Sequence, residues 1–144
     1  MSLDDLYREL ILDHYRNPRN FGRLPEANTS VHLKNPTCGD EIDLQLLVAD
    51  GRIVRAAFSG QGCSISQASA SMMTEAITGK SVEEARAILE DFERMMHGEA
   101  VLRDMGDLAS LEGVARFPVR IKCALLAWEG LDKSLKQIVN PAGK

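Results

Sequence analysis

The chain has 144 residues, a length typical of one compact domain, and 44% of them are hydrophobic, which is enough to bury a core. Its 17 basic and 21 acidic side chains give a net charge of -4, which argues against nucleic acid as the main partner, because phosphate binding requires a basic face. No apolar run approaches the length of a membrane span, and the N-terminus carries acid where a signal peptide would carry base. We therefore expect one domain over residues 1–144, cytoplasmic, that binds neither nucleic acid nor membrane.

The first half of the chain predicts one helix followed by three strands. Apolar residues at helical spacing indicate an amphipathic helix over residues 2–16, which ends before Pro18. Alternating apolar residues and β-branched runs predict strands over residues 29–34, 41–49 and 52–59. Asp50-Gly51 between the last two strands is typical of a tight hairpin, so we expect an antiparallel sheet.

Helices are predicted to dominate the second half. Gly79 is suited to end one helix, and Ser81 with Glu84 forms a capping box for the next. The predicted helices cover residues 64–78, 82–97 and 122–139, with a loop and one short helix over residues 99–115 and an extended segment over residues 117–120. Because the strands run together instead of alternating with helices, the predicted class is α+β, a three-stranded antiparallel sheet with helices packed on one face.

The three cysteines lie at junctions between predicted elements. Cys38 falls between two strands, and Cys63 and Cys123 are predicted to open helices, where the helix dipole favours thiolate over thiol. With Asp40 they offer four ligands, which suits tetrahedral zinc, and three thiolates also suit an iron–sulfur cluster. The spacings contain no C-x-x-C pair, so unconnected thiols remain an alternative on spacing alone.

Other polar residues near these motifs have plainer interpretations as well. Asp40 follows a glycine, and an aspartate at such a position commonly caps a turn or begins a strand. Lys122 is either an ordinary solvated lysine or a charge that lowers the pKa of the Cys123 thiol. The scattered histidines are expected to be structural or exposed and not ligands: His14, His32 and His97.

Three motifs occur in order along the chain: Cys38-Gly39-Asp40, the segment 60–69 that contains Cys63, and the segment 120–128 that contains Cys123. With the N-terminal segment 6–18, they resemble the iron–sulfur assembly proteins of the IscU/NifU N-terminal type, over nearly the whole chain. Two details resemble the SufU branch of that family. Lys122 stands where the scaffold branch typically has His, and a longer insert lies around residues 98–114. Residues 117–120 replace the chaperone motif of the scaffold branch.

The resemblance implies an IscU/SufE-like fold and a zinc-dependent sulfurtransferase. Such a protein accepts persulfide sulfur from a SufS-type cysteine desulfurase and passes it to downstream iron–sulfur assembly proteins. Cys38 would be the sulfur acceptor and so the catalytic residue, leaving the metal to take sulfur while Asp40 stays bound. The implied metal ligands are Cys38, Asp40, Cys63 and Cys123, with Lys122 and Arg120 expected to support the site.

Two alternatives to this function remain open. One is a scaffold on which a [2Fe-2S] cluster is assembled, so that iron or the cluster replaces zinc on the same ligands. The other is a structural module in which zinc only stabilises the fold.

Overall fold

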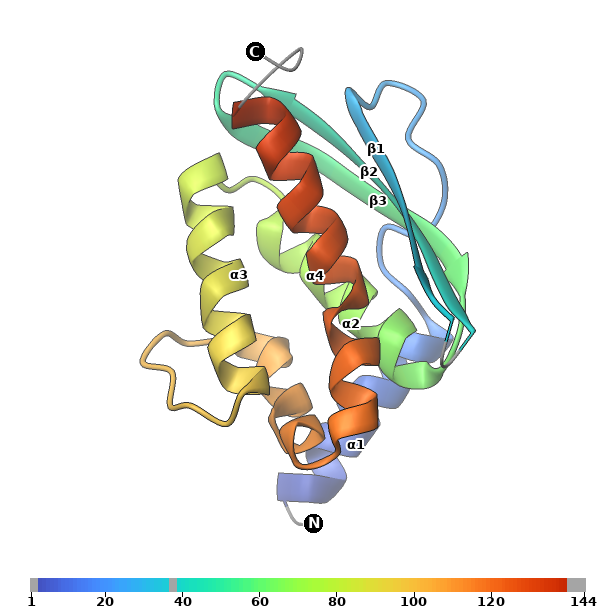
Figure 1. Ribbon diagram of the computed structural model, residues 1–144, viewed down its shortest axis with the longest axis vertical. Helices are drawn as coiled ribbons and strands as arrows, with labels where there is room; N and C mark the ends of the chain where they lie inside the picture. Colours follow the sequence, from blue (N-terminus) through green and yellow to red (C-terminus); the bar gives the residue numbers. More distant parts are fainter. Residues whose placement is uncertain (1–2, 37–38, 140–144) are drawn as a thin grey trace.

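The computed structural model describes residues 3–36 and 39–139. Its elements follow the predicted order of one helix, three strands and then helices (Figure 1). They are α1 (Leu3–Arg16), β1 (Thr29–Asn35), β2 (Asp40–Ala49), β3 (Arg52–Gln61), α2 (Ser64–Ile77), α3 (Val82–Met96), the 3-10 helix η1 (Gly106–Arg116) and α4 (Pro118–Val139).

The three strands form one antiparallel sheet in the order β1-β2-β3. Asp50 and Gly51 join β2 to β3 with φ angles of 53° and 75°, the two positive values that a tight hairpin turn requires. Alternate residues of β2 from Asp40 to Val48 are buried, so one face of the sheet belongs to the core. The register pairs Asn35 with Asp40 at the end of the β1–β2 ladder, and this pairing fixes where the Asp40 side chain emerges.

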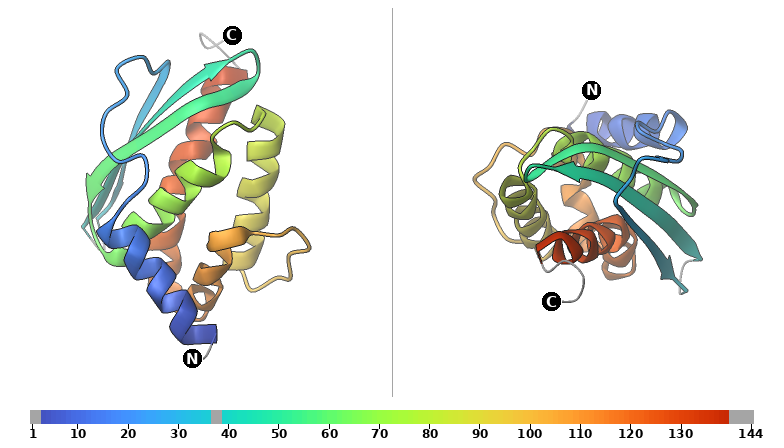
Figure 2. Two further views of the ribbon diagram at one scale, coloured as in Figure 1. Left: turned by 180° about the vertical axis from the view of Figure 1, so that it is seen from behind. Right: turned by 90° about the horizontal axis from the view of Figure 1, so that it is seen from above.

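The helices cover the buried face of the sheet. α2 packs against β3, and α4 packs against β1 and β2 so closely that a Cβ on Gly130 would lie 2.9 Å from Leu33. α1 lies on α2 and α3 on α4, which places them farther from the sheet (Figure 1). On the opposite face, the loop 17–28 crosses the strands, where the Leu24 N–H donates to Gln45 (Figure 2). The predicted α+β class is therefore confirmed.

A polar link inside the core joins α2 to α4. The Trp128 ring stacks on Phe92 with centroids 4.5 Å apart, and its Nε1–H donates to Ser69 Oγ over 3.0 Å. The Ser69 hydroxyl in turn donates to the carbonyl of Ala124 over 2.7 Å. The small residues of α2 therefore do more than allow close packing, because Ser69 holds α4 at the level of its second turn.

Several predicted boundaries shift by one or two residues, and one prediction is wrong. The segment 117–120 was expected to be extended and the last helix to begin at residue 122, but α4 begins at Pro118. Proline suits the first helical position, because its fixed φ is helical and its missing N–H would have no partner there. The insert contains η1, which agrees with a loop and one short helix. Among the described residues, no helix is both long and apolar enough to cross a membrane.

Replacing Ser69 with Ala should lower the free energy of unfolding by about 1–3 kcal/mol, because the buried indole N–H of Trp128 loses its acceptor. Urea denaturation of the metal-loaded protein measures this difference. Ser59→Ala is the control, since Ser59 is partly exposed on β3 and its side chain makes no hydrogen bond within residues 3–36 and 39–139. Equal effects of the two substitutions would show that the Ser69 link contributes nothing.

Candidate metal centre

Three of the predicted ligands meet at one place in the structure. Asp40 begins β2, Cys63 precedes α2 and Cys123 lies in α4, yet their ligand atoms all lie within 4.8 Å of one another. These three elements converge at the lower part of the molecule in Figure 1. Cys38, the fourth predicted ligand and the predicted sulfur acceptor, lies outside the described residues.

Asp40 is fully buried and connects the sheet to α2. Its Oδ1 accepts the backbone N–H of Cys63 over 2.9 Å, and its Oδ2 lies 3.9 Å from Cys63 Sγ. One oxygen thus holds the entry to α2, while the other lies beside a thiol. The plainer interpretation, that Asp40 begins a strand, is confirmed, because Asp40 is the first residue of β2, and its carboxylate is at the same time placed beside a thiol.

Cys63 is the N-cap residue of α2, as the sequence predicted, and it is exposed. Its backbone is extended, with φ -70° and ψ 166°, and its side chain makes no capping hydrogen bond. Ser66 Oγ donates to the Cys63 carbonyl over 3.1 Å and so stabilises the first turn. The first turn of α2 carries no acidic side chain, so Cys63 lies at the positive end of the helix dipole with no carboxylate of that turn opposing it.

Cys123 differs from the prediction in its environment. Because α4 begins at Pro118, Cys123 is the sixth helical residue and lies beyond the first turn, where the effect of the dipole has largely faded. The side chain is buried, at 2% exposure, and its Sγ lies 3.9 Å from the carbonyl of Val119. The expected helix-terminus environment therefore holds for Cys63 and not for Cys123.

The three donors fit a thiolate-preferring ion. Zinc bonds sulfur at about 2.3 Å and carboxylate oxygen at about 2.0–2.2 Å, which separates tetrahedral donors by about 3.5–3.8 Å. The 3.9 Å between Asp40 Oδ2 and Cys63 Sγ is close to that separation. Two sulfurs and one oxygen leave one position of a tetrahedron for a further ligand.

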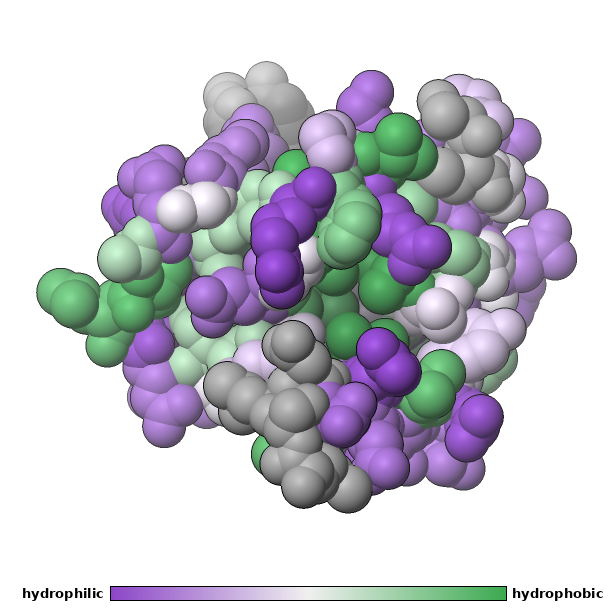
Figure 3. All heavy atoms as spheres, turned by 90° about the horizontal axis from the view of Figure 1, so that it is seen from below, coloured by the Kyte–Doolittle hydropathy of each residue, from purple (hydrophilic) through white to green (hydrophobic). Residues whose placement is uncertain are grey.

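Both basic residues expected to support the site are exposed. Lys122 is exposed and lies about 100° around the helix from buried Cys123. Arg120 is also exposed and lines a cavity of about 780 Å³, together with Ser64, the residue after Cys63. Figure 3 shows the molecule from this end, where apolar surface lies among hydrophilic side chains.

Gly60 and Gly62, the glycines before Cys63, allow a close approach of their backbone to β2. A Cβ on Gly62 would lie 2.3 Å from Asp40 Oδ1 and 2.8 Å from Ser66 Oγ. A Cβ on Gly60 would lie 2.1 Å from the carbonyl oxygen of Glu41 on β2. The sequence does not reveal which carboxylate approaches Gly62, because Asp40 lies on β2, far from Gly62 along the chain.

Gly62→Ala should displace the Asp40 carboxylate and weaken zinc binding by about tenfold or more, the range typical of changes around a metal ligand. Competition with a chromophoric chelator measures the affinity. Gly79→Ala is the matched control, since Gly79 has a φ of +84° and no atom within 4 Å of its added Cβ. It should cost stability with zinc affinity unchanged, so a similar loss of affinity in both variants would contradict the steric argument.

Comparisons with known proteins agree with this arrangement. The family model described as NifU-like N terminal domain matches residues 6–138. The zinc-dependent sulfurtransferase SufU of Bacillus subtilis is 51% identical over 137 residues, which cover 93% of this chain and 92% of that protein. The iron–sulfur cluster assembly scaffold protein IscU of Streptococcus pyogenes is 43% identical over 141 residues, which cover 96% of this chain and 88% of that protein.

A solved structure is similar in fold along almost the whole chain. The N-terminal part of a nitrogen-fixing NifU-like protein from Brucella abortus superposes with a TM-score of 0.87 at 25% identity, covering 97% of this chain and 99% of that one. The family resemblance predicted from three short motifs is thus confirmed by matches that extend over all of the elements. The chain belongs to the NifU-like N-terminal domain family.

Proposed function

We propose that this protein acts in iron–sulfur cluster assembly as a zinc-dependent sulfur acceptor, taking persulfide sulfur from a cysteine desulfurase and passing it on. The observation that carries the proposal is the convergence of Asp40, Cys63 and Cys123 from three separate elements. The 51% identity to a zinc-dependent sulfurtransferase supports zinc as the metal and sulfur as the transferred group. The desulfurase is proposed to be of the SufS type.

The proposed zinc ligands are Asp40, Cys63 and Cys123, with Cys38 as the fourth. Bound zinc would keep the cysteine ligands deprotonated at neutral pH. The chain itself supplies unequal access to them. Cys63 is exposed and Cys123 is buried, so a large partner approaches the centre from the side of Cys63.

The proposed transfer is a thiol–persulfide exchange at Cys38. The Cys38 thiolate attacks the outer sulfur of the desulfurase persulfide, forming one S–S bond while the S–S bond of the donor breaks. The donor cysteine leaves as a thiolate, and the outer sulfur stays with Cys38 as a persulfide. Charge and electrons balance without an added oxidant or reductant, so no further cofactor is required for this step.

The second candidate is a scaffold that assembles a [2Fe-2S] cluster on the same ligands. The identity to the IscU scaffold of Streptococcus pyogenes, at 43%, favours it. Lys122, in the place where that branch typically has His, and the insert around residues 98–114 favour the sulfur acceptor instead. A purely structural zinc module is the third candidate, and the exposure of Cys63 at the junction of β3 and α2 favours the other two, because a partner can reach a thiol presented there.

One experiment separates the three functions. The zinc-loaded protein is mixed with a SufS-type desulfurase and cysteine, and the rate of alanine release and the mass of the chain are measured. A sulfur acceptor raises the rate and gains one sulfur on Cys38, and Cys38→Ser abolishes both effects. A coloured, stable cluster on reconstitution with no rate effect would indicate the scaffold. Neither effect, with unfolding on chelation, would indicate the structural module.

Asp40→Ala should reduce zinc affinity and sulfur uptake together, because the buried carboxylate serves both the metal and the entry to α2. We expect a loss of zinc affinity of at least about tenfold. Asp43→Ala, an exposed carboxylate on the same strand, should leave both unchanged. Unchanged zinc affinity and sulfur uptake in Asp40→Ala would exclude Asp40 as a ligand.

A further inference from the structure

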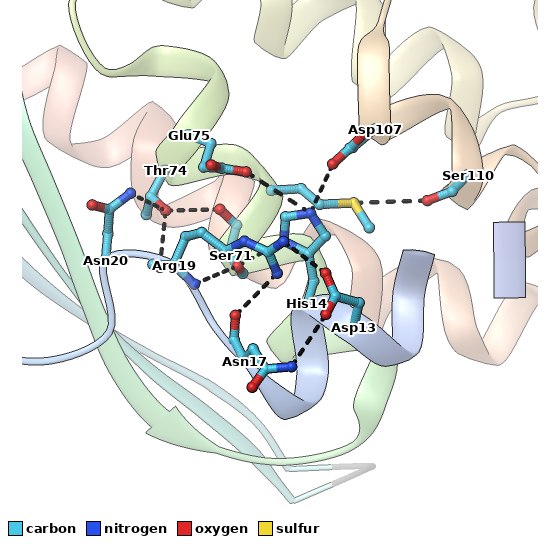
Figure 4. Close-up of polar contacts among 11 residues, drawn as sticks. Asp13, His14, Asn17, Arg19, Asn20, Ser71, Thr74, Glu75, Asp107 and Ser110 are labelled. Atoms are coloured by element: carbon cyan, nitrogen blue, oxygen red, sulfur yellow. Dashed lines mark hydrogen bonds and ion pairs between the residues drawn. The ribbon is translucent and has the colours of Figure 1, made fainter. Parts of the chain in front are cut away.

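A second group of ligand-type side chains lies away from the candidate metal centre, where α1, α2 and η1 meet. It consists of His14 on α1, Glu75 on α2 and Asp107 on η1, with ligand atoms within 4.8 Å of one another. His14 is fully buried, whereas the side chains of Glu75 and Asp107 are 47% and 49% exposed. In Figure 4 both carboxylates approach the same side of the imidazole ring.

The His14 ring presents one nitrogen to both carboxylates. Its Nε2 lies 2.9 Å from Asp107 Oδ2 and 3.9 Å from Glu75 Oε1. Tetrahedral zinc separates a nitrogen and an oxygen donor by about 3.3 Å, so shifts of about half an ångström would place all three around one ion. Because both carboxylates are half exposed, solvent can supply the remaining ligand.

The imidazole of His32 provides an internal comparison. It also has two carboxylate neighbours, but Asp43 lies 2.6 Å from its Nδ1 and Glu41 lies 3.4 Å from its Nε2. Carboxylates on opposite ring nitrogens cannot share one ion with that ring. The arrangement around His14 therefore differs from an ordinary surface contact between histidine and acid.

The other ring nitrogen of His14 is held in a way that suits a metal ligand. Nδ1 lies 2.8 Å from Ser71 Oγ, which also accepts the backbone N–H of Arg19 over 2.9 Å. Without a metal, Nε2–H donates to Asp107, because a carboxylate oxygen only accepts, and Nδ1 shares a second hydrogen bond with the Ser71 hydroxyl. With a metal on Nε2, the ring proton moves to Nδ1 and donates to the free lone pair of Ser71 Oγ. Both ring nitrogens are satisfied in either state.

Arg19 attracts both Glu75 and Asp107, but its hydrogen bond is to Asp13, which has the larger effect on it. Arg19 NH2 lies 2.6 Å from Asp13 Oδ2, and this hydrogen bond holds the pKa of the Asp13 carboxyl below its usual value. The two charges of that pair compensate each other. Glu75 and Asp107 therefore offer two carboxylate oxygens beside one imidazole nitrogen, a donor set that suits a divalent first-row ion.

We propose that His14, Glu75 and Asp107 form a second metal site that takes a divalent first-row transition ion through one imidazole nitrogen and two carboxylate oxygens. The bound ion joins α1, α2 and η1, and thus connects the insert to the body of the domain. α1 and η1 also line the cavity that contains Arg120, so occupancy stiffens one wall of that cavity. The site is independent of the cysteines and of the proposed sulfur transfer.

The test uses zinc-loaded protein from which loosely bound metal has been removed, titrated with Co²⁺ by calorimetry and visible absorption. Co²⁺ binds less strongly than zinc to a given site, so it does not displace zinc from the cysteines. We expect one Co²⁺ per chain, weak visible bands without sulfur-to-cobalt charge transfer, and a higher thermal midpoint. No cobalt uptake, or uptake with charge-transfer bands alone, would overturn the proposal.

Substitutions of the proposed ligands test which residues bind the Co²⁺ ion. Asp107→Asn keeps an oxygen that accepts from His14 but removes the charge, and Glu75→Gln alters only the longer contact, so both should fold and both should lose Co²⁺ affinity about tenfold or more. Ser71→Ala should weaken Co²⁺ affinity by a similar factor, because the His14 ring loses the hydrogen bond that orients it. The matched controls are Glu112→Gln, exposed on the same η1 helix, and His32→Asn. Equal loss in either control, or full affinity in Asp107→Asn and Glu75→Gln, would refute the assignment.

Discussion

The buried carboxylate of Asp40 is the contact on which the candidate metal centre depends. Its Oδ1 fixes the backbone of Cys63 at the entry to α2, and its Oδ2 lies beside the thiol. This approach exists only because Gly62 has no Cβ, and because the β1–β2 register ends at the pair of Asn35 and Asp40. One side chain thus sets the relative position of the sheet and the helix that carries the exposed thiol.

The third candidate ligand, Cys123, is positioned by a different helix. Cys123 lies in α4, whose height against α2 is set by the hydrogen bonds from Trp128 to Ser69 and from Ser69 to Ala124. These bonds lie in the core and do not involve the metal ligands themselves. The geometry of the candidate centre therefore depends on core packing that involves none of its three candidate ligands, as a preorganised site requires.

Much of this architecture was predictable from the sequence, because local patterns carry it. The hairpin at Asp50-Gly51, the cap at Ser81 and the alternation along β2 each determine their own element. The start of α4 was mispredicted, because a proline is compatible with both an extended segment and the first turn of a helix. The motifs around the cysteines pointed to three residues that do converge in space, since the family resemblance supplied the long-range contacts that spacing alone does not. The surroundings of His14 could not be predicted, because Asp107 is 93 residues away and lies in a segment without a regular hydrophobic pattern.

The spacing of the three candidate ligands along the chain has a consequence for how the donor cluster forms during folding. Asp40 and Cys63 are 23 residues apart, and Cys123 follows only after α2, α3 and η1. Bringing them together closes long loops, which costs conformational entropy that the tertiary packing must offset. The donor atoms of Asp40, Cys63 and Cys123 therefore form one cluster only where the sheet, α2 and α4 are packed together. In an unfolded chain the same side chains are far apart in sequence and offer no common set of donors, so the candidate centre is a property of the tertiary structure.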